Sequence, residues 1–357
     1  MPQSRISELR RKMQAANIDA LILTNMPHIR YLTGFTGDTA VLVMARTKNN
    51  LFVDFRFADQ SRRETKGASV TVLKSDCYSG LKDTPLLKTP NLRVGFSGTF
   101  VPVTLRDRIA TMLPAALPVN ADSVLGDLGW VKDAAEIANI KKAAAIADTA
   151  FERILSIVRP GVGENELAAE LEYQMTMLGS ERPAFETIVA SGYRAAMPHG
   201  VASRKRLAKG DFVTFDFGAT VGGSVCDITR TVVVGKATPR HKKLYGIVLK
   251  AQLAGIRKVK AGIDGKDVDK ACRDIITKAG FGKQFGHGTG HGIGIFIHMG
   301  PRVSQLSSDK LKPGNVITIE PGIYVRGWGG VRIEDDVLVT RSGGVVLNKA
   351  PKNLLEL

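Results

Sequence analysis

Three of the six histidines in this chain of 357 residues lie within twelve residues, in the segment Phe285–His298. His287 and His291 are four residues apart, and glycines at alternate positions from 286 to 294 disfavour a regular helix. On an extended backbone these two side chains share one face, whereas His298 has the opposite parity and needs a bend to reach them. A core position is the ordinary explanation for one histidine, but three among glycines favour a functional site.

Four acidic residues lie inside apolar segments that resemble β-strands, where a buried carboxylate is costly unless a cation compensates its charge. They are Asp216 in Val213–Gly218, Asp227 in Ser224–Val234, Glu320 in Val316–Tyr324 and Glu334 in Val331–Val339. Period-two alternation places Thr214 and Asp216 on one face of their strand, and Arg332 and Glu334 on one face of theirs. For any one of these acids taken alone, an ion pair with arginine is an equally open interpretation.

Together with one neutral imidazole, four carboxylates carry about the charge that two divalent cations neutralise. An oxygen-rich donor set favours manganese, cobalt or a similar ion over a pure zinc cage. Two such ions can bind and deprotonate a bridging water and stabilise the oxyanion formed at a carbonyl carbon. The chain lacks HExxH, GxxxxGK[ST] and GxSxG, and the glycine-rich run does not fit GxGxxG. The residues therefore predict a dinuclear hydrolytic site.

The elements that must position these residues fall into two regions. Residues 1–122 begin with a helical repeat, followed by strand-like runs at 20–24, 39–44 and 50–54, which is typical of an α/β layer domain. Residues 114–129 show little periodicity, so we expect a linker at 123–132 and a second domain over 133–357. In that domain helices are expected at 137–158, 164–178, 239–260 and 265–279, between the acid-bearing strands. The predicted fold class is α/β, of the α+β kind.

The charge balance is strongly basic, with 50 Lys and Arg against 34 Asp and Glu. The surplus is spread along the chain without a basic arm or interleaved aromatic residues, so nucleic acid is not the predicted partner. Three cysteines without a CxxC pair and a charged N-terminal segment without an apolar core predict a cytoplasmic location. No apolar run approaches the roughly 18 residues that a membrane-spanning helix needs, so no membrane association is expected.

Six ordered motifs carry a resemblance to a known family. They are Met197–Gly200, Asp216–Gly218, Cys226–Thr231, Gly286–Gly294, Ile319–Tyr324 and Val331–Asp335. In sequence and order they resemble the Xaa-Pro peptidases of the pita-bread metallopeptidase family, M24, which includes prolidase and aminopeptidase P. The segment Asn25–Phe35 is similar to the creatinase-type N-terminal domain that these enzymes carry. The resemblance implies a creatinase-like N-terminal α/β domain followed by a pita-bread catalytic domain.

The resemblance also implies a role for each site residue. The metal ligands would be Asp216, Asp227, His291, Glu320 and Glu334, with Asp227 and Glu334 bridging two divalent ions per subunit, manganese first and cobalt or zinc as alternatives. Glu320 would take the proton of the attacking water. The substrate-binding residues would be His199 and His298, which stabilise the tetrahedral intermediate, His287, which lines the pocket, and Arg302, which holds the substrate carboxylate. Arg332 would orient a ligand carboxylate, and an exposed surface arginine is the alternative for Arg302.

The implied activity is hydrolysis of Xaa-Pro bonds in proline-containing peptides by a homodimeric enzyme. A proline nitrogen carries no hydrogen, so peptidases that dock substrates through that N–H fail at this bond. Dipeptidase and aminopeptidase preference both remain open. One position departs from the family, because Met299 follows His298 where an acid is usual, and this bears on the hydrogen bonding around His298. The alternatives are a non-catalytic pita-bread protein that binds nucleic acid or acidic partners, and a metal-free creatinase-like amidinohydrolase.

Overall fold

The computed structural model describes residues 2–357, with side chains from residue 4 onward. It contains two compact units, one ending at Leu128 and one spanning Gly129–Leu357. Both combine helices and sheets, so the predicted α/β class is confirmed. The division into 1–122, a 123–132 linker and 133–357 stays a prediction, and a short helix, α5 (Asp122–Leu125), occupies part of the expected linker.

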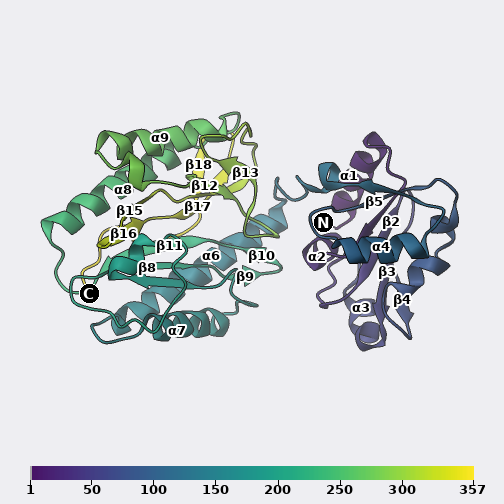
Figure 1. Ribbon diagram of the computed structural model, residues 1–357, viewed down its shortest axis with the longest axis horizontal. Helices are drawn as coiled ribbons and strands as arrows, with labels where there is room; N and C mark the ends of the chain where they lie inside the picture. The colour runs from purple at the N-terminus through teal and green to yellow at the C-terminus, as the bar shows by residue number, and fades with distance from the viewer. Residues whose placement is uncertain (1) are drawn as a thin grey trace. The chain divides into compact units, whose positions relative to one another are not determined.

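The first unit is built on a six-stranded mixed sheet with the order β4-β3-β2-β1-β5-β6 (Figure 1). Its strands are β1 (Ala20–Leu23), β2 (Val41–Ala45), β3 (Asn49–Asp54), β4 (Ser69–Leu73), β5 (Arg93–Phe96) and β6 (Leu117–Asn120). Its longer helices are α1 (Pro2–Ala15), α2 (Met26–Thr33), α3 (Ala58–Glu64) and α4 (Val103–Met112). The three strand-like runs of the sequence correspond to β1, β2 and β3, whose side chains are almost all buried.

In the second unit, two pairs of helices enclose the strands (Figure 1). The helices are α6 (Ala134–Ile154), α7 (Glu164–Met177), α8 (Pro239–Lys258) and α9 (Gly265–Lys278), close to the predicted ranges. Helix α6 begins at a capping box formed by Asp133 and Glu136, and helix α8 begins after Thr238 with proline at its first position. In Figure 1 α6 and α7 lie on one side of the strands and α8 and α9 on the other.

The strands of the second unit form separate small sheets. A three-stranded sheet has the order β11-β8-β7, and a five-stranded sheet has the order β13-β12-β14-β17-β18. The strands are β7 (Ile188–Ser191), β8 (Phe212–Phe217), β9 (Thr220–Val221), β10 (Ser224–Val225), β11 (Ile228–Val233), β12 (Gly290–Gly292), β13 (Met299–Val303), β14 (Val316–Ile319), β15 (Gly322–Val325), β16 (Gly329–Arg332), β17 (Asp335–Val339) and β18 (Gly344–Val346). Strands β9 and β10 pair with each other, as do β15 and β16.

Three of the predicted acid-bearing strands are interrupted at the acid itself, which corrects the expectation of continuous strands. Asp227 lies between β10 and β11, Glu320 between β14 and β15, and Glu334 between β16 and β17. At each break the chain passes from one sheet to another. Strand alternation therefore does not determine which way the acidic side chain points. Asp216 alone lies within a strand, β8, as predicted.

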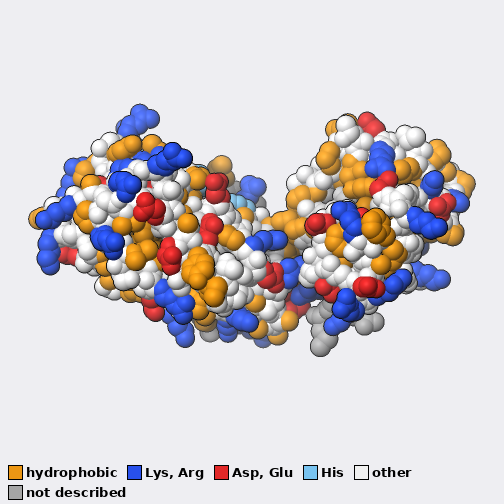
Figure 2. Space-filling model, turned by 90° about the horizontal axis from the view of Figure 1, so that it is seen from below, with side chains coloured by type: hydrophobic (Ala, Val, Ile, Leu, Met, Phe, Trp, Pro, Cys, Tyr) orange, Lys and Arg blue, Asp and Glu red, His pale blue; other side chains and the backbone are white. Residues whose placement is uncertain are grey.

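The surface and the helices bear on two further expectations. Lys and Arg side chains are dispersed over the visible face of each unit in Figure 2, without a single large basic patch. Among residues 2–357, no helix combines the length and the apolar character required to cross a bilayer.

Candidate active site

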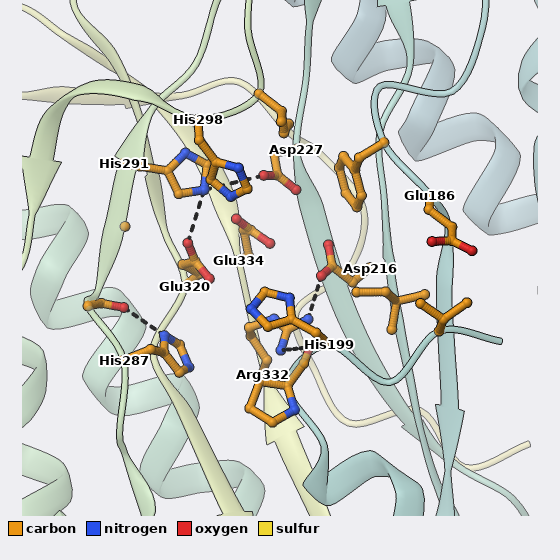
Figure 3. A pocket seen from close by; sticks show the side chains of 17 residues that line it. Glu186, His199, Asp216, Asp227, His287, His291, His298, Glu320, Arg332 and Glu334 are labelled. Carbon is orange, nitrogen blue, oxygen red and sulfur yellow. Dashed lines mark hydrogen bonds and ion pairs between the residues drawn. The ribbon is translucent and has the colours of Figure 1, made fainter. Parts of the chain in front are cut away.

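A cavity of about 450 Å³ lies within the second unit. Its walls include every predicted site residue except one: His199, Asp216, Asp227, His287, His291, His298, Glu320, Arg332 and Glu334. The exception is Arg302, which is exposed and is not part of the described lining. Apolar side chains of Phe185, Ile188, Val201 and Ile297 complete the wall, with Glu186 beside them. Figure 3 shows the carboxylates and imidazoles facing the cavity from two sides.

The two sides of the cavity come from different sheets. Asp216 on β8 and Asp227 before β11 belong to the three-stranded sheet. His291 lies on β12 and Glu320 directly follows β14, both in the five-stranded sheet, and Glu334 precedes β17 of that sheet. Donor atoms of Asp227, His291 and Glu334 all lie within 4.8 Å of one another. His291 Nε2 is 3.6 Å from Asp227 Oδ2 and 3.3 Å from Glu320 Oε1.

Burial and mutual repulsion make this cluster electrostatically costly. Burial, followed by repulsion from the neighbouring carboxylates, raises the pKa of Asp227 and of Glu334 well above the ordinary value. Burial also opposes ionisation of Glu320, but the hydrogen bond and charge of His291 outweigh it and lower the pKa of Glu320 to about 2. Among the described residues, no Lys or Arg forms an ion pair with any of these three acids. Over residues 4–357, these three acids therefore have no direct Lys or Arg counter-ion.

Unpaired donor atoms point to what would supply that charge. Asp227 Oδ1 and Glu334 Oε1 are buried and have no hydrogen-bond partner in the described chain. Buried carboxylate oxygens without a partner are rare unless an ion or water completes them. Hard oxygen donors with one imidazole suit a divalent cation such as manganese. The residues present therefore fit a metal site.

Arg332 orders one side of the cluster. Its Nη2 donates to Asp216 Oδ2 at 2.5 Å and its Nε donates to Thr229 Oγ1 at 3.0 Å. Because that hydroxyl accepts from Arg332, its own hydrogen is directed to Glu334 Oε2, 2.5 Å away. Burial raises the pKa of Asp216, and the charge of Arg332 opposes this shift. Arg332 thus holds one carboxylate directly and a second through Thr229.

Arg332 also contacts Tyr324, which forms a hydrogen bond with His287. Arg332 Nη1 donates to the hydroxyl oxygen of Tyr324 at 2.9 Å, and this oxygen lies 2.8 Å from His287 Nε2. His287 Nδ1 lies 2.7 Å from the carbonyl oxygen of Gly288, so Nδ1 carries the hydrogen and Nε2 accepts from Tyr324. Burial lowers the pKa of His287, in keeping with a neutral ring. Both nitrogens of His287 are therefore occupied.

Sequence patterns alone predict no role for Thr229 or Tyr324. Both lie inside quoted motifs, and Thr229 is the antiparallel partner of Asp216 in the register of β8 and β11. That position next to a predicted metal ligand was the available signal for Thr229. Tyr324 and His287 are 37 positions apart in the sequence, so no local sequence pattern indicates their contact.

Of the remaining histidines, His298 lies beside His291, and His199 lies apart from both, near Arg332 (Figure 3). The predicted bend lies at residues 294–298, and it brings the ring centroid of His298 to 4.4 Å from that of His291. Burial, and then the charge of His291, lower the pKa of His298, so its ring is neutral near pH 7. His199 is exposed at the wall, next to Pro198, whose carbonyl oxygen accepts from Arg332 Nη1 at 3.1 Å.

Met299, the departure from the family, does not line the described cavity. A methyl group placed on Gly294 would lie 3.0 Å from Met299 Sδ and 3.2 Å from Lys132 Nζ, so these two side chains meet beside Gly294. Lys132 is buried, and burial lowers the pKa of its amine to about 7. The substitution therefore changes the surroundings of Lys132 and not the cavity wall.

This cluster of acids and histidine, contributed from two sheets, defines the class of protein as a metal-dependent hydrolase. Residues 138–341 match the model of metallopeptidase family M24, and residues 5–128 match the creatinase/prolidase N-terminal domain. The chain belongs to metallopeptidase family M24, and the resemblance drawn from its motifs is confirmed.

Relatives and solved structures cover nearly the whole chain. The chain is 37% identical to an Xaa-Pro dipeptidase of Pyrococcus horikoshii, over 96% of both proteins. The solved structure of an Xaa-Pro dipeptidase from Bacillus anthracis superposes with a TM-score of 0.94 at 40% identity and covers both chains completely. An X-Pro aminopeptidase from Thermotoga maritima superposes with a TM-score of 0.90 at 36% identity, covering 97% of this chain and 100% of that one.

Proposed function

We propose that this protein is a metal-dependent peptidase that hydrolyses Xaa-Pro peptide bonds. The observation that carries the proposal is the complete cluster of four acids and one histidine facing one cavity. Similarity over nearly the full length to Xaa-Pro dipeptidases supports the substrate class. The alternative of a non-catalytic binding protein has no support in the dispersed basic side chains of Figure 2.

We assign Asp216, Asp227, His291, Glu320 and Glu334, which all line the cavity, as the residues that would hold two ions, and Asp227 and Glu334 would be shared between them. Manganese is the preferred ion, with cobalt or zinc as alternatives, because four of the five donors are carboxylates. When bound, the ions lower the pKa of a water molecule and polarise the scissile carbonyl group. The raised pKa values of Asp227 and Glu334 support this assignment, because a cation would relieve their repulsion.

The side chains then divide the remaining work. Glu320 is ionised, so it accepts a proton from the attacking water and passes it to the departing proline nitrogen. His298, which is neutral, and His199 donate hydrogen bonds to the oxyanion that forms at the carbonyl carbon. Arg332 orients Asp216, and its charge opposes the rise that burial causes in the pKa of this carboxyl group.

The cavity wall supplies the substrate pocket. Both ring nitrogens of His287 are occupied by Tyr324 and a carbonyl oxygen, so His287 shapes the wall without donating to the substrate. The apolar side chains of Ile188, Val201 and Ile297 offer surface for the pyrrolidine ring. A role for Arg302 in holding the substrate carboxylate stays a prediction, as do the homodimer and the cytoplasmic location.

The test is hydrolysis of Ala-Pro, Ala-Pro-Ala and Met-Ala-Ala by protein loaded with Mn(II), beside protein stripped with a chelator. We expect cleavage of the proline peptides alone, only in the loaded sample. The ratio of dipeptide to tripeptide cleavage distinguishes a dipeptidase from an aminopeptidase. A folded, loaded sample that leaves both proline peptides intact would contradict the proposal.

A further inference from the structure

The side chain of Arg230 is buried and does not line the described cavity. It lies on β11, three residues after Asp227, and is 1% exposed. Burying a guanidinium group costs several kcal/mol unless every N–H is paired. The partners of Arg230 therefore show what the structure gains from placing it there.

All five N–H groups of Arg230 have acceptors, and most are main-chain oxygens. Nη1 donates to the carbonyl oxygens of Thr229 at 3.0 Å and Glu334 at 2.5 Å. Nη2 donates to Asp335 Oδ1 at 2.7 Å and to the carbonyl oxygen of Ala350 at 2.9 Å. Nε donates to the carbonyl oxygen of Pro351 at 3.1 Å. One side chain thus ties together three segments of the chain.

Two of these segments carry the acids that we assign to both ions. The segment of Thr229 follows Asp227, and the main-chain N–H of Asp227 donates to Asp336 Oδ2 at 3.0 Å. The N–H of Glu334 donates to the carbonyl oxygen of Thr229 at 3.1 Å. The guanidinium of Arg230 closes this joint because it bonds the carbonyl oxygens of Thr229 and Glu334 with the same nitrogen.

The third segment, residues 348–352, connects the other two segments to helix α6. Lys352 Nζ donates to Asp335 Oδ2 at 2.6 Å, so Asp335 is held between Lys352 and Arg230. Asp148 on α6 accepts from the main-chain N–H groups of Lys349 at 2.6 Å and Ala350 at 3.1 Å. The segment that accepts from Arg230 is itself anchored to a helix.

We propose that Arg230 is a positioning residue for the metal site, which clamps the segment of Asp227 to the segment of Glu334 through residues 348–352. This inference rests on the metal site of the proposed function, but not on its substrate. The two acids come from different sheets, so their separation depends on how these segments are joined. Lysine at position 230 would keep the charge, but its single ammonium cannot reach five acceptors in three directions.

The test compares Mn(II) binding to Arg230→Lys and to the wild type, by isothermal titration after chelator treatment. Groups that orient metal ligands typically contribute about 10- to 100-fold in metal affinity, and we expect a loss in this range. The control is Leu171→Ala, a buried position on α7 outside the network, which lowers the unfolding temperature through a cavity. We expect its Mn(II) affinity to match the wild type.

Two results would overturn the proposal: unchanged Mn(II) affinity in Arg230→Lys, or an equal loss in Leu171→Ala. If Arg230→Lys does not fold, Lys352→Met takes its place, because this side chain is 25% exposed and tolerates substitution. Loss of its bond to Asp335 should weaken Mn(II) binding about threefold, and unchanged affinity would again overturn the proposal. Wild-type protein that binds Mn(II) but cleaves neither Ala-Pro nor Ala-Pro-Ala would reject the proposed function and leave this test in place.

Discussion

Replacing Thr229 with valine removes one hydroxyl and leaves the shape of the site almost unchanged. That hydroxyl accepts from Arg332 Nε and donates to Glu334 Oε2 in a fully buried position. In Thr229→Val, both charged groups lose a partner that water cannot replace. We expect the variant to fold and to lose turnover, because the orientation of both groups depends on this hydroxyl.

The magnitude follows from the two hydrogen bonds. A hydrogen bond to a charged group contributes about 1.5–3 kcal/mol. A bound cation would compensate Glu334, so we count only the bond from Arg332 in full. At 1.36 kcal/mol for each factor of ten, the loss in kcat/KM on Ala-Pro is about 10- to 150-fold.

The assay measures steady-state hydrolysis of Ala-Pro at saturating Mn(II), with Thr231→Val as the matched control. Thr231 lies on the same face of β11, but its hydroxyl donates to the main-chain carbonyl oxygen of Arg332 at 2.9 Å and reaches no side chain of the cavity. We expect Thr231→Val to stay within about threefold of wild type, since neutral hydrogen bonds contribute about 1 kcal/mol or less. Equal rates in both valine variants would refute the role assigned to Thr229.

Three further predictions follow from the site. Glu320→Gln should lower kcat by about 100-fold or more without lowering the unfolding temperature, because it removes both the proton acceptor and one carboxylate assigned as a metal ligand; a variant with wild-type turnover would reject both roles. In chelated protein, the pKa values of Asp227 and Glu334 are raised above those of the unfolded chain, so stability should fall as pH rises from 5 to 8. Mn(II) should therefore raise the unfolding temperature more at pH 8 than at pH 5, as calorimetry would show, and the opposite order would contradict the assignment. Met299→Glu should raise the unfolding temperature at pH 6, because the buried amine of Lys132 has a pKa of about 7 and is charged at that pH. The same variant should keep turnover within about threefold of wild type, because position 299 lies outside the cavity wall.

Hydrophobic periodicity in the sequence predicted which helices and strands exist better than it predicted where the strands end. Period-two alternation located Asp216 correctly because β8 is continuous, with both neighbours paired to it. The same reasoning failed at Asp227 and Glu334, because alternation describes a strand but not the point where the chain turns onto another sheet. At Glu320 a signal was present, since Pro321 cannot donate to a sheet and marks the break.

Elements with weak periodicity were missed for a different reason. Strand β6 lies at the edge of its sheet and most of its side chains are exposed, so its sequence shows no apolar alternation. Helix α5 has four residues, too few to show a helical repeat. The predicted donor residues, which line one cavity, stood out in the sequence because acids in apolar segments are costly to bury. Thr229 and Tyr324 make contacts that only the folded chain brings together.

The division of the site between two sheets has a consequence for biosynthesis. The hydrogen bond between Thr229 and Glu334 joins residues 105 positions apart. The cluster of acids and His291 therefore cannot assemble until Glu334 has been translated. Domains fold as units during synthesis, and a metal site that forms only on folding fills only then. The nascent second unit therefore lacks a complete donor set until Glu334 has been translated, so the proposed site can bind ions only late in synthesis.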